Sequence, residues 1–440
     1  MADHGGLSVH FPLHPDEQAA MLQAIGVGSV DDLFQDIPAE FRNPELNMPA
    51  PLSEMEVLQE LQRLSERNLY PGRYTSFLGA GVYRHFTPSV VSALVSRGEY
   101  LTSYTPYQAE ASQGTLQSTF EFQTMSSQIM GMEVANAGMY DGATSLAEAA
   151  LMACRVTQRG RVAIVDTVAP NYAEVVRTYA EPQGIEVYTV SSSVRELEPD
   201  TACLLVQSPN FFGHLEDVGG LTDVAHNHGA LMCTSADPVA MSMFKSPGAY
   251  GVDIATAEGQ ALGVPPSFGG PYVGIFTCKQ EFFRQMPGRI AGRTTDTQGR
   301  TGYVLTLQTR EQHIRRERAT SNICTSTALI GLMATIYVAC MGKQGLRRVA
   351  ELCYHKAHYA AGQIAEIPGY SLPMEDTFFQ EFVVRCPRPP AEINAALQDR
   401  GIIGGLDISD LTPNGMLVCV TEVNSRREID SLVSALKEIG

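Results

Sequence analysis

Asp237 is the residue of this sequence whose setting points most directly to chemistry. It follows the apolar run ALMCTSA, which reads as a buried strand, and so stands at a strand end. Enzymes that use pyridoxal phosphate place at such a position the acid that pairs with the pyridine nitrogen, while a lysine further along the chain forms a Schiff base with the cofactor. The lysines of the chain therefore decide whether this chemistry is possible here.

Five lysines are present, and none is well placed for a Schiff base. Lys245 follows Asp237 by eight residues, too few to cross a connection and return on another strand, and Lys279 lies beyond a Gly-Gly-Pro bend and the strand after it. The remaining three fall in a domain-bridging region or in the last helix: Lys343, Lys356 and Lys437. Without an amine nucleophile the chain cannot hold the cofactor covalently, so we expect it to be catalytically incomplete by itself.

A helix start supplies a second candidate. YDGATSLAEAALMACR predicts a helix that opens at Gly142, with the hydroxyls of Thr144 and Ser145 in its first turn. The free N–H groups of such a turn suit an anion, for example a phosphate. Serine and threonine at a helix start are also ordinary caps, and this alternative stays open.

These residues lie in a segment where strands and helices alternate. From residue 112 onward, helical stretches separate short runs rich in Val, Ile and Ala: RVAIVD, IEVYTV, ACLLVQ, ALMCTS, VDIATA and YVGIF. This alternation predicts an α/β fold with a mainly parallel sheet covered on both faces. Ligand sites in such sheets lie beyond the carboxyl ends of the strands, where Asp237 stands.

Three regions are predicted from the periodicity. Residues 1–70 carry helical spacing around Pro15–Val27 and Pro51–Arg67, with Ser53 as an N-cap, and form a helical arm. Residues 71–344 form the large α/β domain and end in a bridging helix. Residues 345–440 read strand, helix, strand, helix, and form a small α+β domain.

The composition excludes several classes of partner. A formal charge of −17 argues against nucleic acid or an anionic membrane surface, since both need a positive stripe. No stretch reaches the roughly 20 apolar residues of a membrane helix, and no signal sequence is evident, so we expect a soluble, cytoplasmic chain. Only 18% of the residues are charged, which indicates buried subunit interfaces.

No metal site is expected. The nine cysteines are scattered without a C-x-x-C pair, which supports neither a disulfide framework nor a zinc site. The pairs His226/His228 and His355/His358 lack a third ligand nearby in sequence and are interpreted as ordinary polar residues.

Three long stretches resemble one known family. YTPYQAEASQGTLQSTFEFQTMSSQIMGMEVANAGMYDGATSLAEA, GVDIATAEGQALGVPPSFGGPYVGIF and QHIRRERATSNICT are similar to the P-protein of the glycine cleavage system, either the first subunit of its split form or the amino-terminal half of its fused form. The resemblance runs from about residue 10 to the end. Departures from the family pattern are Arg318, Ala109 and Ser326-Thr327, none of which is an obviously irreplaceable group.

The resemblance implies a fold and a division of labour. P-proteins have the aminotransferase-like fold (pyridoxal-phosphate fold type I) and two similar halves, of which the second carries the lysine and the cofactor. By this resemblance Gln260, 23 residues after Asp237, occupies the region where the lysine would lie. Asp237, Thr144 and Ser145 would then be vestigial, with no cofactor bound covalently by this chain and pyridoxal phosphate on the partner subunit.

The activity implied is that of glycine decarboxylase. Together with the lysine-bearing second subunit, in a heterotetramer, the chain would decarboxylate glycine on pyridoxal phosphate and pass the aminomethyl group to the lipoyl arm of the H carrier protein. The alternatives are a non-catalytic scaffold or regulatory binding protein that kept the fold, and, more remotely, an independent enzyme that uses Lys245.

Two segments could reach the partner's site across the interface. SYTPYQ offers the phenols of Tyr104 and Tyr107 on a proline-stiffened turn, able to donate hydrogen bonds or cover a ring. RRERATSN offers Arg315, Arg316 and Asn322, whose guanidinium groups suit a carboxylate or a phosphate. Tyrosines near proline often only pack, and such arginines often only join subunits, so a structural role remains the alternative for both.

Overall fold

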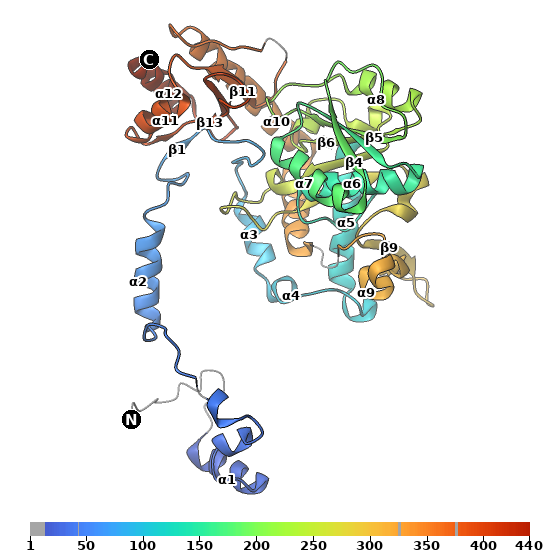
Figure 1. Cartoon of the computed structure of the whole chain (residues 1–440), viewed down its shortest axis with the longest axis vertical. Coiled ribbons are helices and arrows are strands. Elements are labelled where there is room, and N and C mark those ends of the chain that lie inside the picture. The colour runs from blue at the N-terminus through green and yellow to red at the C-terminus, as the bar shows by residue number, and fades with distance from the viewer. Residues whose placement is uncertain (1–13, 43, 324–326, 375–376) are drawn as a thin grey trace. The chain divides into compact units, whose positions relative to one another are not determined.

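The computed structural model describes residues 14–42, 44–323, 327–374 and 377–440 (Figure 1). They fall into two units, one that ends at Asn68 and one that runs from Leu69 to Gly440. Ser326, one of the departures from the family pattern, lies outside the described residues.

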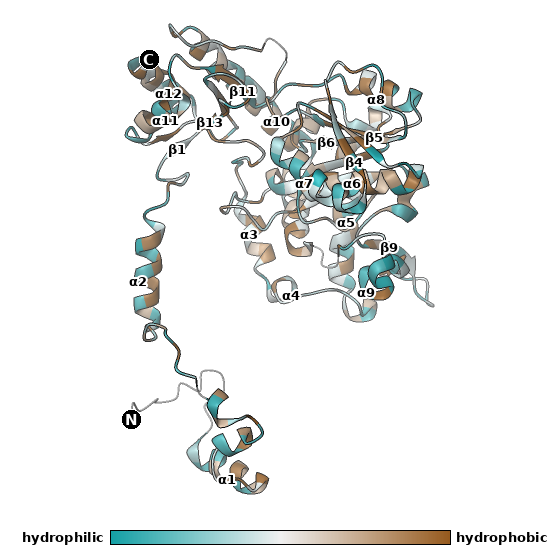
Figure 2. Cartoon of the chain, in the orientation of Figure 1, coloured by the Kyte–Doolittle hydropathy of each residue, from teal (hydrophilic) through white to brown (hydrophobic). Residues whose placement is uncertain are grey.

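The first unit contains two helices, α1 (Pro15–Ile25) and α2 (Glu54–Ser65). The predicted N-cap of α2 is confirmed: Ser53 and Glu56 form a capping box, in which the Ser53 amide donates to the Glu56 carboxylate at 2.8 Å. No residue of either helix is buried. The ribbon of α2 carries both hydrophobic and hydrophilic colours in Figure 2, and its apolar residues Met55, Val57, Leu58, Leu61 and Leu64 are exposed.

The second unit is built on a seven-stranded sheet of order β2-β8-β7-β6-β5-β3-β4. Its strands are β2 (Val134–Ala135), β3 (Arg161–Val165), β4 (Glu186–Val190), β5 (Thr201–Ser208), β6 (Leu231–Ala236), β7 (Ile254–Glu258) and β8 (Gly274–Cys278). The pairs between β4 and β7 are parallel, whereas β8 is antiparallel to both of its neighbours. The six predicted strands are therefore confirmed.

Helices cover this sheet and complete the large core. They are α5 (Gln113–Met130), α6 (Gly142–Thr157), α7 (Pro170–Ala180) and α8 (Val218–Asn227). Earlier in the chain come α3 (Ser89–Val95), which buries Val91 and Val95, and α4 (Gly98–Leu101), none of whose residues is buried. The helix α6 packs against β5 to β8 and α7, and α8 packs against β5 and β6. Because the central strands are apolar on both faces, nearly every residue of β5, β6 and β7 is buried.

The long helix α10 (Ala328–Ala365) links this core to the carboxyl-terminal elements. It is bent at Gly342, whose φ of 61° and ψ of 176° interrupt the helical backbone. By length and composition α10 could cross a membrane. Its buried side chains belong to the two hydrophobic cores, however, so we describe it as a core helix.

The carboxyl-terminal elements form a second hydrophobic core. The predicted order strand, helix, strand, helix is confirmed as β11 (Glu381–Arg385), α11 (Pro390–Gln398), β14 (Gly415–Cys419) and α12 (Arg426–Ile439). The short strand β13 (Leu406–Asp407) joins their antiparallel sheet. Phe77 packs into this core, and the adjacent β1 (Thr75–Ser76) pairs with β12 (Ile402–Ile403).

One hairpin and one short helix lie outside the predicted pattern. The hairpin consists of β9 (Ile290–Thr295) and β10 (Thr301–Thr306), which close around Gly299 in its left-handed conformation. The polar segment after it contains the short helix α9 (Gln312–Arg315). Most of these residues are exposed or half-buried, which explains the weak hydrophobic signal that they leave in the sequence.

Candidate functional site

A small cavity lies where β6 and β7 end. Its polar lining comes from the seven-stranded sheet and the turns that follow its strands, from α7, from the start of β11 and from the segment before α3. These residues are Tyr83, Tyr172, Gln207, Ser235, Asp237, Glu258, Gln260, Gln380 and Glu381. The cavity volume is about 40 Å³. A water molecule needs roughly 10–15 Å³ by this measure, and pockets for organic ligands hold roughly 300 Å³ or more. The cavity therefore has room for a few water molecules only.

Asp237 follows β6 directly, as the apolar run predicts, and its carboxylate is fully engaged. One oxygen accepts the backbone N–H groups of Val239 and Ala240 at 2.8 and 3.0 Å. The other accepts the side-chain amide of Gln380 at 3.0 Å. Loss of solvation raises the pKa of Asp237. The oxygen that could face a ring nitrogen is thus used by a residue next to β11.

Gln260 lies in a 3-10 turn (Gly259–Ala261) just after β7 and is 1% exposed. Its side-chain oxygen accepts the Tyr83 N–H at 2.8 Å, and its NH₂ group donates to the carbonyls of Tyr83 and Val264 at 2.8 and 2.7 Å. The structure therefore brings Asp237 and Gln260 to one cavity. The amide is saturated by backbone groups and presents no free nucleophile.

All five lysines lie in the described part of the chain, and none lines this cavity. Lys245 lies 4.0 Å from the ring centroid of Tyr250, and Lys279 pairs with Asp253. Lys356 donates to two backbone carbonyls, whereas Lys343 and Lys437 are exposed. That none of these lysines forms a Schiff base with the cofactor stays a prediction.

The first turn of α6 is satisfied within the chain. Asp141 caps the helix by accepting the Thr144 N–H at 2.8 Å, and the Ser145 hydroxyl donates to the Asp141 carbonyl at 2.6 Å. The Gly142 N–H donates to the Glu258 carboxylate at 2.9 Å. The hydroxyls of Thr144 and Ser145 thus bond to Asp141 within the first turn, and the Glu258 carboxyl group lies where an anion could bind.

Glu258 is a site residue that the sequence interpretation missed. It ends β7, and its second oxygen accepts the Gln260 N–H at 2.9 Å. Loss of solvation raises the pKa of Glu258 to about 8 despite its backbone donors. The only signal in the sequence was its place two residues before Gln260, at a strand end.

Glu381 closes the opposite side of the cavity. It is buried, and its two oxygens accept the Ala80 N–H at 2.5 Å and the Tyr83 hydroxyl at 2.6 Å. Burial raises the pKa of Glu381 to about 7. Gly79 permits this approach, because a Cβ atom there would lie 2.4 Å from the Glu381 carboxylate. The segment FLGAGVYRH, residues 77–85, thus forms part of the cavity wall through Gly81 and Tyr83.

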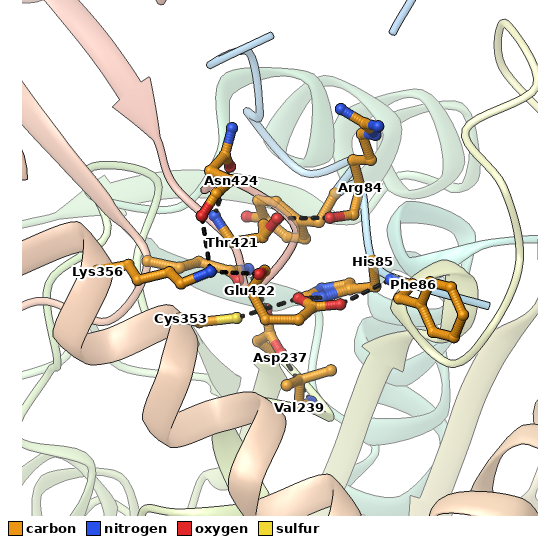
Figure 3. A network of polar contacts seen from close by, with 12 residues as sticks. Arg84, His85, Phe86, Asp237, Val239, Cys353, Lys356, Thr421, Glu422 and Asn424 are labelled. Carbon is orange, nitrogen blue, oxygen red and sulfur yellow. Dashed lines mark hydrogen bonds and ion pairs between the residues drawn. The ribbon is translucent and has the colours of Figure 1, made fainter. Parts of the chain in front are cut away.

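The same segment is tied to the loop after β14, as Figure 3 shows. His85 pairs with Glu422 at 2.7 Å, and the Phe86 N–H donates to the other Glu422 oxygen at 2.6 Å. Cys353 places its sulfur 3.5 Å from Glu422. Potential ligand atoms of His85, Cys353 and Glu422 lie within 4.8 Å of one another.

A hydrogen-bonded network describes these three residues better than a metal centre. Burial raises the pKa of Cys353 well above its ordinary value, which favours the thiol over the metal-binding thiolate. The Lys356 ammonium also contacts the Glu422 carbonyl, adding a positive charge next to the cluster (Figure 3).

The cavity does not fit pyridoxal phosphate. It offers no amine among its lining residues and has too little volume. Its helix terminus is occupied by Glu258, and three carboxyl groups surround it, those of Asp237, Glu258 and Glu381. A phosphate ester, which carries about two negative charges near neutral pH, would face these groups.

Tyr107 stands in a separate cluster near α9. The phenol accepts a hydrogen bond from Arg289 at 3.1 Å, and Arg289 also pairs with Glu311 at 3.0 Å. Arg289 and Glu311 are buried, whereas Tyr107 is 50% exposed and Tyr104 is 74% exposed. The His313 ring meets Tyr107 edge-on at 5.5 Å. The segment of Tyr107 and the segment of Glu311 and His313 thus meet at Arg289, which contacts both Tyr107 and Glu311. The sequence interpretation did not single out Arg289.

The predicted arginines occupy different surroundings. Arg315, Arg316 and Asn322 are exposed. Arg316 and Asn322 line a hollow of about 430 Å³, together with Glu148 and Arg155 of α6. Glu148 accepts the Ser321 hydroxyl at 2.7 Å, which ties this segment to α6. Among the described residues the guanidinium that bonds Tyr107 is that of Arg289, not that of Arg315 or Arg316.

Known proteins match the chain over nearly its full length. The sequence model of the family described as glycine cleavage system P-protein matches residues 8–436. A Thermomicrobium roseum protein named probable glycine dehydrogenase (decarboxylating) subunit 1 is 50% identical over 447 residues, covering 98% of this chain and 99% of that protein.

Solved structures agree with this match. A crystal structure of glycine decarboxylase (P-protein) of the glycine cleavage system, in inhibitor-bound form, gives a TM-score of 0.93 at 43% identity and covers 98% of this chain and 100% of that chain. A C-DES mutant with glycine covalently linked to its PLP cofactor shares the fold alone, with a TM-score of 0.61 at 14% identity over 84% of this chain and 97% of that chain. The predicted pyridoxal-phosphate fold type I is confirmed, and the chain belongs to the glycine cleavage system P-protein family.

Proposed function

We propose that this chain is the cofactor-free half of a two-subunit glycine decarboxylase. A second subunit carries the lysine and the pyridoxal phosphate, and the complex decarboxylates glycine and passes the aminomethyl group to the lipoyl arm of the H carrier protein. One observation carries the proposal. The cavity beside Asp237 has no lysine among its lining residues, and backbone groups take up the hydrogen bonds of the Gln260 side-chain amide.

Similar proteins support the two-subunit arrangement. The relative from Thermomicrobium roseum is named subunit 1, and this chain covers 99% of its length. We infer a permanent and apolar interface with the second subunit, roughly 2,000 Å² or more in area. A cytoplasmic location without nucleic-acid or membrane partners is consistent with the charge of −17.

The chain contributes side chains to the partner's site rather than a site of its own. Tyr104 and Tyr107 are exposed, and Tyr107 is oriented by a buried arginine, which suits a group that must be held in place before a partner arrives. Arg315, Arg316 and Asn322 are exposed as well and are proposed to contact the glycine carboxylate or a phosphate. Asp237, Thr144 and Ser145 are proposed to be vestigial.

Reconstitution tests this function. The chain is purified alone, the second subunit alone, and both together, and each sample is assayed for exchange of labelled bicarbonate into the carboxyl group of glycine with lipoylated H protein present. We expect exchange from the pair and none from this chain. Borohydride reduction should place the pyridoxyl group on a lysine of the second subunit.

Two results would contradict the proposal. A stoichiometric pyridoxyl adduct on Lys245 would identify this chain as an enzyme in its own right. A pair that elutes separately at micromolar concentration, with no exchange above that of the second subunit alone, would favour the non-catalytic scaffold instead.

A further inference from the structure

We propose that Glu258 occupies the place where this fold holds the cofactor phosphate, so that the chain excludes pyridoxal phosphate instead of merely lacking the amine to react with it. The proposal rests on the proposed function, because it concerns why one half of the enzyme is free of cofactor.

The contact between Glu258 and α6 has the geometry of an anion site. The helix has 16 residues, and its first N–H group, that of Gly142, points at the Glu258 carboxyl group at 2.9 Å. Helix N-termini hold phosphate groups through such N–H groups and the helix dipole. Here the same donor is used by a group of the chain itself, and the second Glu258 oxygen is taken by the Gln260 N–H.

Gly142 is required for this close approach. A Cβ atom at that position would lie 2.4 Å from the Tyr172 hydroxyl and 2.9 Å from the Glu258 Cβ. The Tyr172 ring is buried, and its hydroxyl lies beside the helix start. The glycine, the tyrosine and the carboxyl group therefore fill the space in front of α6.

Two further positions would contact the cofactor, the acid that pairs with the ring nitrogen and the position of the Schiff-base lysine. Protein groups occupy both of them as well. The acid at the strand end, Asp237, is bonded by Gln380 instead of a ring nitrogen. The amide of Gln260 is bonded on both edges by the Tyr83 backbone. Protein groups therefore occupy all three positions that would contact the cofactor. Glu258 bonds to α6, Gln380 bonds to Asp237, and the Tyr83 backbone bonds to Gln260.

This arrangement separates exclusion of the cofactor from loss of reactivity. If the missing amine were the whole cause, Gln260→Lys alone would restore covalent binding. If Glu258 closes the phosphate place, Gln260→Lys alone will leave the cofactor excluded, and a phosphate site will open only when the carboxyl group is removed.

The experiment uses the full chain with Glu258→Ala, Glu258→Gln, Gln260→Lys and the double variant Glu258→Ala/Gln260→Lys. Inorganic phosphate binding is measured by calorimetry. Pyridoxal phosphate is then added, reduced with borohydride, and the peptide that contains position 260 is analysed by mass spectrometry. Glu258→Gln is the matched control, because its amide oxygen still accepts the Gly142 N–H and fills the same volume.

We expect phosphate to bind Glu258→Ala at least tenfold more tightly than wild type or Glu258→Gln, and the adduct at position 260 to form in the double variant only. An equal affinity in wild type and in folded Glu258→Ala, or an adduct in Gln260→Lys as complete as in the double variant, would overturn the proposal. Circular dichroism verifies folding, and Glu258→Ser provides a second opened variant. None of these measurements involves the second subunit, so failure of the proposed function would not be mistaken for failure of this inference.

Discussion

The Tyr107 hydroxyl accepts a hydrogen bond from Arg289, which forms a buried ion pair with Glu311. Arg289 and Glu311 are each less than 10% exposed, and the arginine uses its remaining donors on the loop that carries Tyr107. A buried pair of this kind is costly to break, because either partner alone would be a desolvated charge. The phenol is therefore oriented by a rigid support while half of its surface faces solvent.

Tyr107→Phe removes only the phenolic oxygen and tests its role. We expect glycine–bicarbonate exchange by the two-subunit complex to fall more than tenfold, a loss of about 1.4 kcal/mol in transition-state stabilisation, with the complex intact. Arg315→Met is expected to act in the same direction. Tyr359→Phe, which removes a hydroxyl from the carboxyl-terminal part of the chain, is the control. Unchanged exchange in both test variants would show that these segments are structural.

Glu381 gives the stability of the chain a pH dependence. Its pKa is raised to about 7 in the folded chain and stands at 4.5 when solvated. Between these values the folded chain keeps a proton that the unfolded chain has lost, so stability falls as the pH rises through this window. Glu258, with a pKa of about 8, acts in the same direction up to a higher pH.

We therefore expect the free energy of unfolding of wild type to decrease from pH 5 to pH 7. That of Glu381→Gln should decrease less steeply, and the two slopes should differ by up to about 1.4 kcal/mol per pH unit. Urea unfolding followed by circular dichroism measures this, since the chain has no tryptophan. Equal slopes in the two proteins would show that Glu381 does not retain its proton.

Residue types at strand ends and helix starts were readable from the sequence, but their partners were not. Asp237 could be placed because it follows an apolar run, whereas its partner Gln380 lies 143 residues away. Glu258, Arg289 and Glu381 also act through contacts distant in sequence. No local pattern marks such pairs, because the fold alone brings them together.

Among the secondary-structure elements, α10 is where sequence and structure can be compared most closely. The sequence predicts a bridging helix at the end of the large domain, and in the structure α10 continues through a bend at Gly342 to Ala365. The φ of 61° and ψ of 176° at Gly342 fall in a region that is nearly exclusive to glycine. The hairpin of β9 and β10 escaped prediction because its strands mix polar with apolar residues and are mostly half-buried or exposed, so neither helical nor alternating periodicity marks them.

Two glycines of α10 should respond oppositely to the same substitution. Gly342→Ala forces a side chain onto a backbone that disfavours it and should destabilise the chain by about 1–3 kcal/mol. Gly362→Ala lies in regular helix with open space around the new Cβ and should stabilise it by up to about 1 kcal/mol. Midpoints of urea unfolding compare the two. If both substitutions stabilised the chain, residues other than glycine could adopt the backbone conformation of the bend without strain.

At the scale of the whole molecule, the first unit is unusual in having helices without a buried face. A helix of 12 residues is marginal in water without packing, yet Met55, Leu58 and Leu61 of α2 are each more than half exposed. Within the described residues of this unit these apolar side chains are exposed, and we propose that they pack on the second subunit.

Leu61→Asp tests this role of α2. Burial of one leucine contributes roughly 1.5–3 kcal/mol, so the affinity of the two subunits should fall by roughly tenfold or more. Gln59→Asp introduces the same charge on the polar face and should leave the affinity unchanged. Sedimentation velocity over a dilution series measures both. Equal dissociation of the two variants would show that this face of α2 does not contact the partner.

The Glu258 carboxyl group, which accepts the Gly142 N–H, also has a consequence for how a cofactor site could evolve in this chain. A lineage that regained the lysine at position 260 would still carry Glu258, and one that lost Glu258 first would open a phosphate place with no amine to use it. Neither single substitution offers natural selection a working cofactor site, so the two changes would have to arrive together. If the proposal about Glu258 holds, a chain with both residues could gain a cofactor site only through two substitutions, at positions 258 and 260.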